Sequence, residues 1–203
     1  KSNFTEVMYL LLHGELPTQN QFTTFDNNIK KYNFIADEMK KIIDVFPRSA
    51  HPMGVLSSLT SALTAFNPKA VNVNSKEEMD HAAELMLAKF SHLCAWTYRK
   101  TLGLPLNHGD NNLSYVENFY KMAFRLPNAD FEMDPVVVAA LDKLLILHAD
   151  HEQNCSTSTV RMVGSAHTGL FASVSAGVSA LWGPLHGGAN QAVIEMLELI
   201  EQD

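Results

Sequence analysis

Toward its C-terminal end the chain carries the stretch Gly183-Pro184-Leu185-His186-Gly187-Gly188-Ala189-Asn190. Glycine and proline interrupt regular structure, so this stretch predicts a turn followed by the start of a helix. The two glycines after His186 lack side-chain bulk and would let a ligand approach the backbone. A histidine at a helix N-terminus lies at the positive end of the helix dipole, which favours a neutral ring that still donates one hydrogen bond. His186 is therefore either a ligand-binding histidine or an incidental surface residue in a turn.

Signals for helix starts recur along the rest of the chain. Capping-box patterns, in which a Ser or Thr precedes a Glu or Gln by three residues, occur at 18–21, 75–78 and 114–117. Asp134-Pro135 adds a good N-cap residue before a proline suited to the first helical turn. Glycine and proline separate these starts, and no alternating strand pattern of useful length occurs. The sequence predicts an all-α fold of eight or nine helices.

Apolar residues recur at helical spacing in two long segments. One segment covers residues 22–43 and the other residues 85–98, and each predicts one amphipathic helix. The segments 52–66 and 171–182 are instead rich in Gly, Ala and Ser, which lets neighbouring helices approach closely. Two interpretations of these small residues are open: packing within one subunit, or packing across a dimer interface.

Composition limits the classes of function. The 203 residues are 46% apolar and 18% charged, which is typical of a globular protein with a sizeable core. The net charge of −7, without a basic block, argues against nucleic acid as a partner. No run of about 18 apolar residues or signal peptide occurs, so we expect no membrane span. Cys94 and Cys155 are expected to be reduced thiols of a cytoplasmic protein.

A second group of polar residues lies in His148-Ala149-Asp150-His151-Glu152. If this segment is helical, the two histidines are three residues apart and Glu152 follows His148 by four, so all three share a face. Two histidines and a glutamate at that spacing can bind zinc or iron. However, the His-Glu-x-x-His pattern of zinc proteases is absent, and no second ligand cluster stands out. We therefore expect no metal site, and histidines with a purely structural role are the other alternative.

Several motifs occur together in an order that resembles the citrate synthase family, in particular its bacterial type II branch. They are Thr5 to Thr18, His51-Pro52-Met53, Asn112-Leu113-Ser114-Tyr115, Leu145 to Asn154, and the stretch around His186. The resemblance covers nearly the whole chain. It implies a multi-helical large domain over residues 1–185, and a hinge with the first helix leading into a small domain over residues 186–203.

The same resemblance implies a function and a set of site residues. Members of the family condense acetyl-CoA with oxaloacetate and water to citrate and CoA, and they use no cofactor. His186 matches the histidine that stabilises the enolate of acetyl-CoA. His151 matches a histidine that binds oxaloacetate, while Asn154 and Ser156 fall at the substrate pocket and His148 in a supporting position. The family also implies a cytoplasmic homodimer or hexamer.

The resemblance also identifies the chain as a fragment. In the family, a second catalytic histidine, the catalytic aspartate and the main substrate arginines follow the histidine at position 186, in a Gly-Phe-Gly-His-Arg-Val-Tyr type stretch that is absent here. We expect the isolated fragment to be inactive. The alternatives are a 2-methylcitrate synthase that uses propionyl-CoA, an inert helical fragment that dimerises, and a metal-binding helical protein. No nucleotide-binding motif occurs, so regulation by NADH is not expected.

Overall fold

The computed structural model describes residues 1–70 and 72–202, and within these residues it contains helices and no strand. The all-α prediction is therefore confirmed, although the described residues form ten α-helices instead of eight or nine. The helices are α1 (Phe4–His13), α2 (Gln19–Tyr32), α3 (Asp37–Asp44), α4 (Pro52–Phe66), the 3-10 helix η1 (Pro68–Ala70), α5 (Lys76–Leu102), α6 (Tyr115–Phe124), α7 (Pro135–Leu147), α8 (Cys155–Gly164), α9 (Leu170–Leu181) and α10 (Gly188–Glu201).

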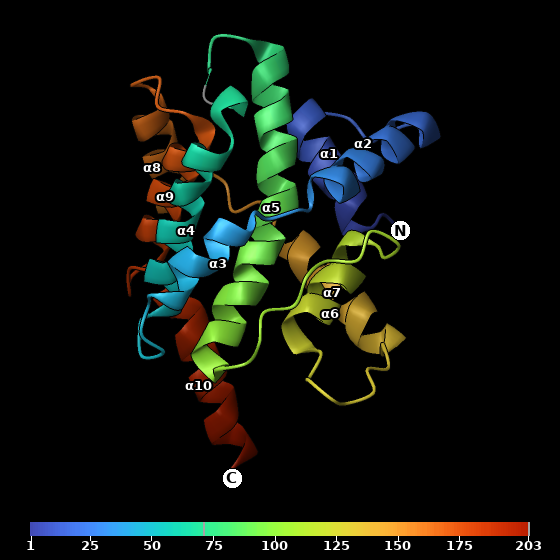
Figure 1. Cartoon of the computed structure of the whole chain (residues 1–203), viewed down its shortest axis with the longest axis vertical. Coiled ribbons are helices and arrows are strands. Elements are labelled where there is room, and N and C mark those ends of the chain that lie inside the picture. Colours follow the sequence, from blue (N-terminus) through green and yellow to red (C-terminus); the bar gives the residue numbers. More distant parts are fainter. Residues whose placement is uncertain (71, 203) are drawn as a thin grey trace.

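The long helix α5 runs through the middle of the molecule (Figure 1). Helices α4, α8 and α9 lie together on one side of it, and α1, α2, α6 and α7 lie on the other side. Helix α10 extends away from this body toward the C-terminus. No helix in the described part of the chain is both long and apolar enough to span a membrane.

The predicted helix starts are confirmed by the hydrogen bonds of their caps. Thr18 and Ser114 each form a complete capping box with the residue three positions later. Ser75 accepts a hydrogen bond from the backbone of Glu78, and Asp134 caps α7 with proline at its first position. Each cap satisfies an N–H group that has no partner within its own helix. These local interactions explain why the starts could be predicted from the sequence.

The prediction of one helix over residues 22–43 is wrong. Helix α2 ends at Tyr32 and α3 begins at Asp37. The break is held by a residue distant in the sequence, because the ammonium group of Lys89 donates hydrogen bonds to the carbonyl oxygens of Tyr32 and Phe34. Across the break Phe34 is 67% exposed, whereas Ile35 is 1% exposed and joins the core. Apolar residues continue through the break because the chain re-enters the core there.

The main hydrophobic core lies among α3, α4, α5 and α9. Its fully buried side chains include Met39, Ile43, Leu59, Trp96 and Phe171. A second, smaller cluster joins α1 and α2 to α5. Burial of these apolar surfaces fixes α4 and α9 against α5, and these two helices lead to the candidate site.

Helices α4 and α9 pack against each other through small residues within this chain. The Ser57 hydroxyl lies 3.0 Å from the carbonyl oxygen of Ser175 and 2.7 Å from the Ser179 hydroxyl. The Ser175 hydroxyl donates in return to the carbonyl oxygen of Ser57 at 2.8 Å. Packing within one subunit, one of the two interpretations of these segments, therefore accounts for the facing serines. A dimer interface on the remaining surface of these helices stays a prediction.

Candidate active site

A tight turn carries His186 between α9 and α10. The N–H of His186 donates to the carbonyl oxygen of Gly183 at 2.9 Å, and the N–H of Gly187 donates to that of Leu181 at 3.0 Å. A Cβ atom at Gly187 would lie 2.2 Å from the Leu181 carbonyl oxygen, so only glycine fits this close approach. Helix α10 then begins at Gly188, as the sequence predicts.

The structure brings His186 together with Ser156, another predicted site residue. Ser156 is the second residue of α8, and its Oγ lies 2.8 Å from Nε2 of His186. The same Oγ lies 2.9 Å from the carbonyl oxygen of Gly177 in α9. A Cβ atom at Gly177 would lie 2.5 Å from Cγ2 of Val160, so the glycine allows α8 and α9 to approach closely.

The single hydroxyl proton of Ser156 limits the protonation of the His186 ring. If Ser156 donates to Gly177, then Nε2 of His186 carries the proton and donates to Ser156, which leaves Nδ1 as an acceptor in the neutral ring. If Ser156 donates to Nε2, the proton of the neutral ring is on Nδ1. Among the described residues no hydrogen bond involves Nδ1, so only the second arrangement leaves His186 a free donor.

The segment with His148 and His151 is not the helix that their spacing suggested. Helix α7 ends at Leu147, and the ring Nδ1–H of His148 donates to the carbonyl oxygen of Leu144 at 2.7 Å. His151 lies in the following loop, with its ring centroid 5.7 Å from that of His148. The prediction that His148, His151 and Glu152 share one helical face is therefore wrong, although the two histidine rings remain neighbours.

Local interactions after α7 explain why the helix stops. The Asp150 carboxylate accepts a hydrogen bond from the N–H of Glu152 at 2.8 Å, which closes a turn. Glu152 has φ of 54°, in the left-handed region that a helix does not contain. Within residues 1–70 and 72–202, no group of three His, Cys, Asp or Glu side chains is arranged to hold a metal ion.

Asn154 is the N-cap of α8. Its Oδ1 accepts a hydrogen bond from the N–H of Thr157 at 3.0 Å, so it fixes the start of the helix that carries Ser156. Its amide group makes a longer contact of 3.4 Å with the carbonyl oxygen of Glu152. In the described part of the chain, no hydrogen bond joins His148, His151 or Asn154 to Ser156 or His186. The predicted residues thus form two groups, one at the turn and one in the loop before α8.

A cavity of about 600 Å³ opens beside the turn. It includes two residues to which sequence analysis gave no role, His51 and Trp182, whose rings stack with centroids 4.9 Å apart. The sequence feature that could have indicated a role for His51 is its position before Pro52 at a helix start, where a side-chain acceptor can cap the helix. The contact with Trp182 joins residues far apart in the sequence, and no sequence pattern indicates it.

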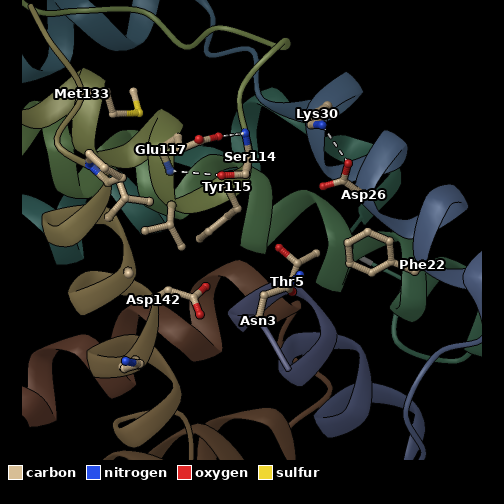
Figure 2. A pocket seen from close by; sticks show the side chains of 15 residues that line it. Asn3, Thr5, Phe22, Asp26, Lys30, Ser114, Tyr115, Glu117, Met133 and Asp142 are labelled. Atoms are coloured by element: carbon tan, nitrogen blue, oxygen red, sulfur yellow. Dashed lines mark hydrogen bonds and ion pairs between the residues drawn. The ribbon is translucent and has the colours of Figure 1, made fainter. Parts of the chain in front are cut away.

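Another cavity, also of about 600 Å³, lies among α1, α2, α6 and α7 (Figure 2). Its carboxylates are already engaged: Asp26 pairs with Lys30 at 2.8 Å, Glu117 belongs to the capping box of α6, and Asp142 accepts from the N–H of Phe4 at 2.9 Å. These interactions connect helices α1 and α7 and stabilise the starts of α1 and α6. They give the carboxylates a structural role.

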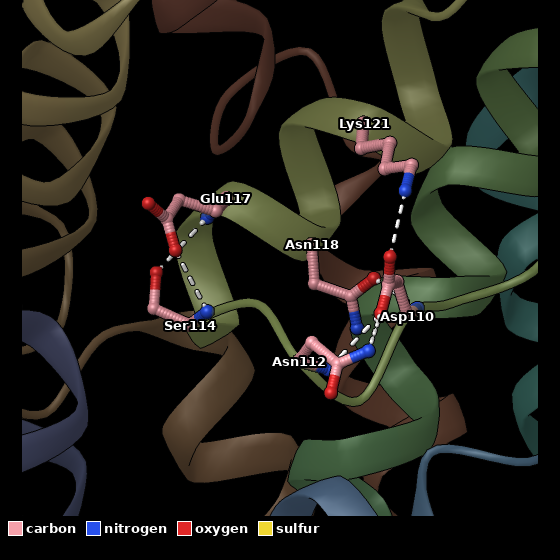
Figure 3. Close-up of polar contacts among 6 residues, drawn as sticks. All are labelled: Asp110, Asn112, Ser114, Glu117, Asn118 and Lys121. Carbon is pink, nitrogen blue, oxygen red and sulfur yellow. Dashed lines mark hydrogen bonds and ion pairs between the residues drawn. The ribbon is translucent and has the colours of Figure 1, made fainter. Parts of the chain in front are cut away.

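A smaller cavity of about 450 Å³ lies beside the loop that precedes α6. In this loop Asp110 lies 2.7 Å from the Lys121 ammonium group and accepts from the N–H of Asn112 (Figure 3). The hydrogen bond from Lys121 holds the pKa of Asp110 below its usual value. His92 is 1% exposed, and burial lowers its pKa to about 3. Its ring is therefore neutral at physiological pH.

Fold and site together define an all-helical domain in which a serine of α8 contacts a histidine in the turn between the last two described helices. The family model described as "Citrate synthase, C-terminal domain" matches residues 1–203. The chain belongs to the citrate synthase family, as its motifs predict.

Two relatives of similar sequence carry the same family name. The chain is 50% identical over 198 residues to Citrate synthase 1 of Mycobacterium tuberculosis, covering 98% of this chain and 46% of the relative. It is 47% identical over 202 residues to citrate synthase of Corynebacterium glutamicum, covering 100% of this chain and 46% of the relative. The chain therefore spans about half the length of these relatives.

Solved structures agree with the fold. Citrate synthase from Pyrobaculum aerophilum matches with a TM-score of 0.85 and 35% identity, over 98% of this chain and 50% of that one. A ternary complex of citrate synthase from Thermoplasma acidophilum with carboxymethyl coenzyme A and oxaloacetate matches with a TM-score of 0.89 and 27% identity, over the same shares.

Proposed function

We propose that the protein to which this chain belongs condenses acetyl-CoA with oxaloacetate and water to give citrate and CoA. Membership of the family supports the reaction, and the relative solved with carboxymethyl coenzyme A and oxaloacetate supports the choice of substrates. The observation that carries the proposal for this chain is the contact of 2.8 Å between Ser156 and His186. It fixes one end of a histidine ring and leaves the other nitrogen available.

In the proposed reaction, a carboxylate removes a proton from the methyl group of acetyl-CoA. The enolate carbon forms a bond to the ketone carbon of oxaloacetate as the ketone π bond breaks and its oxygen takes up a proton. Water then adds to the thioester carbonyl carbon, the carbon–sulfur bond breaks, and CoA leaves as the thiol. His186 donates its Nδ1–H to the oxygen of the forming enolate, while Ser156 donates to Nε2. A donor preorganised at a developing oxyanion contributes about 3 kcal/mol to lowering such a barrier. Binding of the thioester oxygen would select this arrangement of protons.

The other predicted site residues have roles in the same proposal. His151, exposed in the loop before α8, binds oxaloacetate, and His148 supports it through the neighbouring ring. Asn154 adds its amide group to that pocket. The catalytic carboxylate and the arginines that bind the substrate carboxylates are contributed by residues outside this sequence, and no cofactor takes part. We infer a large domain over residues 1–185, with a hinge and the first helix of the small domain over 186–203, in a cytoplasmic homodimer or hexamer.

The proposal is tested by measuring CoA release. The 203-residue chain and the protein that contains it are each given acetyl-CoA, with and without oxaloacetate. Parallel reactions contain propionyl-CoA in place of acetyl-CoA. We expect no turnover by the chain alone and oxaloacetate-dependent turnover by the whole protein, reduced at least 100-fold by His186→Ala. A preference for propionyl-CoA would instead identify a 2-methylcitrate synthase. Turnover by the chain alone would contradict the assignment of catalytic groups to residues outside it.

A further inference from the structure

We propose that His51, Gly54 and Trp182 form a clamp that positions His186, a role that rests on the function proposed above. The clamp joins the first turn of α4 to the C-terminal end of α9. His51 and Trp182 are positioning residues in this inference, because they act on the turn and not on a substrate. The clamp combines one ring stack, one helix cap, one steric requirement and the hydrogen bonds of the turn.

The orientation of the His51 ring is set by the cap of α4. Its Nδ1 accepts a hydrogen bond from the N–H of Met53 at 3.2 Å, so the proton of the neutral ring is on Nε2. The ring then stacks on the indole of Trp182, with centroids 4.9 Å apart and an angle of 26° between the planes. The cap thus holds an aromatic surface at the position where α9 ends.

The indole of Trp182 packs against α4 at Gly54. A Cβ atom at this position would lie 3.2 Å from Cζ3 and 3.3 Å from Cη2 of Trp182, which is tighter than ordinary contact. The missing side chain therefore lets the six-membered ring of the indole lie against α4. Trp182 is still 48% exposed, so its position depends on these contacts more than on complete burial.

The clamped residue is part of the turn that carries His186. Trp182 is the C-cap of α9, and its N–H donates to the carbonyl oxygen of Val178 at 3.2 Å. The preceding carbonyl, of Leu181, accepts the hydrogen bond from Gly187, the residue that follows His186. A shift of Leu181 and Trp182 would therefore move both ends of the turn.

Two contacts from different helices consequently hold the candidate site. Ser156 of α8 contacts the ring of His186 directly, and His51 with Gly54 of α4 holds the backbone from which that ring projects. The hydrogen bonds of Ser57 to α9 keep α4 in the register that this clamp requires. Through the clamp, the position of His186 therefore depends on the position of α4.

The experiment separates the cap from the stack by substitutions in the 203-residue chain. His51→Asn keeps a side-chain acceptor for the cap and removes the ring, whereas His51→Phe keeps the ring and removes the acceptor. Trp182→Ala removes the stack and Trp182→Phe retains part of it. The readouts are the NMR signals of the His186 ring and the hydrogen-exchange rate of the Gly187 N–H, with the N–H of buried Ile29 in α2 as an internal reference.

We expect exchange at Gly187 to rise at least 10-fold in Trp182→Ala and His51→Asn, with changed His186 signals and less than a 2-fold change at Ile29. Trp182→Phe should stay within about 3-fold of the parent chain. His51→Phe keeps an aromatic ring but loses the cap that orients it, so its rise should lie between those of Trp182→Phe and His51→Asn. The clamp is refuted if Gly187 and His186 are unchanged in Trp182→Ala, or if Ile29 changes as much as Gly187. If Trp182→Ala does not fold, Gly54→Ala gives the same test, because its methyl group displaces the indole.

These readouts need no substrate, so the clamp and the proposed function can fail separately. In the whole enzyme, Trp182→Ala should lower kcat about 10-fold with little change in KM for oxaloacetate, and Trp182→Phe should restore most of the loss. Turnover with an unaffected kcat in Trp182→Ala would overturn the clamp and leave the function standing. A clamp confirmed by NMR in a protein that never releases CoA would overturn the function alone.

Discussion

Oγ of Ser156 and Nε2 of His186 lie 2.8 Å apart although 30 residues separate them in the chain. Ser156 stands at the start of α8 and His186 after the end of α9, so the antiparallel packing of these two helices brings them together. The carbonyl oxygen of Gly177 competes for the same hydroxyl proton at 2.9 Å. The protonation of His186 therefore depends on which neighbour Ser156 donates to.

Replacing Ser156 with alanine should change both the tautomer of His186 and turnover. In the free chain we expect the proton on Nε2, because Ser156 donates to Gly177, and ¹⁵N NMR of the imidazole measures this directly. Ser156→Ala removes the acceptor for that proton and should produce a mixture of tautomers. In the whole enzyme kcat should fall about 10- to 100-fold, since an unmade hydrogen bond of this kind costs about 1–3 kcal/mol.

The control for this substitution is Ser158→Ala on the same helix. Among the described residues, the one hydrogen bond of the Ser158 side chain is accepted from the amide of Gln153 at 3.4 Å, so its loss should leave the His186 spectrum unchanged. Equal spectra and equal turnover for the two variants would contradict a role of Ser156 at His186.

The two glycines after His186 should respond differently to alanine. A methyl group at Gly187 would meet the Leu181 carbonyl oxygen at 2.2 Å. One at Gly188 would meet Cβ of Pro184 at 3.6 Å and the Gly183 carbonyl oxygen at 3.8 Å, which are ordinary contacts. Gly187→Ala should therefore lower the free energy of unfolding by about 1–3 kcal/mol, the usual cost of overpacking. Gly188→Ala should be neutral or stabilising by up to about 1 kcal/mol, because it reduces the entropy of the unfolded chain. Urea unfolding of both variants measures the difference, and equal stabilities would exclude the steric role of Gly187.

The parts of the fold that were predicted from the sequence depend on local interactions. Helix starts at Thr18, Ser114 and Asp134 follow from hydrogen bonds within three residues, so the residue types alone indicate them. The break after Tyr32 could not be predicted in this way, because it depends on Lys89, 57 residues further along the chain. A local pattern contains no information about such a partner.

In the candidate site, too, the local features could be predicted from the sequence and the contacts between distant residues could not. The motif around His186 predicts the turn and the start of α10, but the contact with Ser156 depends on how two helices pack. The proposed helix through His148 and His151 was wrong because the Asp150 carboxylate closes a turn and Glu152 adopts a left-handed conformation. Glutamate rarely adopts this conformation, so the residue types alone do not indicate it.

Asn154 allows its cap role to be separated from its proposed role in substrate binding. Asn154→Ala removes the acceptor for the N–H of Thr157 and should destabilise the chain by about 1 kcal/mol. Asn154→Ser keeps a good cap, so its unfolding free energy should stay within about 0.5 kcal/mol of the parent. If the amide also binds oxaloacetate, Asn154→Ser raises KM for oxaloacetate in the whole enzyme while stability is retained. An unchanged KM would restrict Asn154 to the cap.

Buried His92 should make the chain less stable in mild acid. Burial lowers its pKa to about 3 in the folded chain, whereas an unfolded chain has a histidine pKa of about 6.5. Between these values the unfolded chain binds a proton that the folded chain does not, so stability is complete above pH 6.5 and is lost as the pH falls toward 3. The loss from pH 7 to pH 5 should be about 2 kcal/mol from this residue.

Urea unfolding at pH 7, 6 and 5 measures this loss in the parent chain and in His92→Gln. Glutamine does not titrate, so the variant should lose about 2 kcal/mol less over the same interval, whatever its stability at pH 7. The slope is therefore the informative quantity, because removal of the ring also disturbs the contact with Trp96, whose centroid lies 5.1 Å away. Parallel curves for His92→Gln and the parent chain would show that His92 is not the group that makes the fold sensitive to acid.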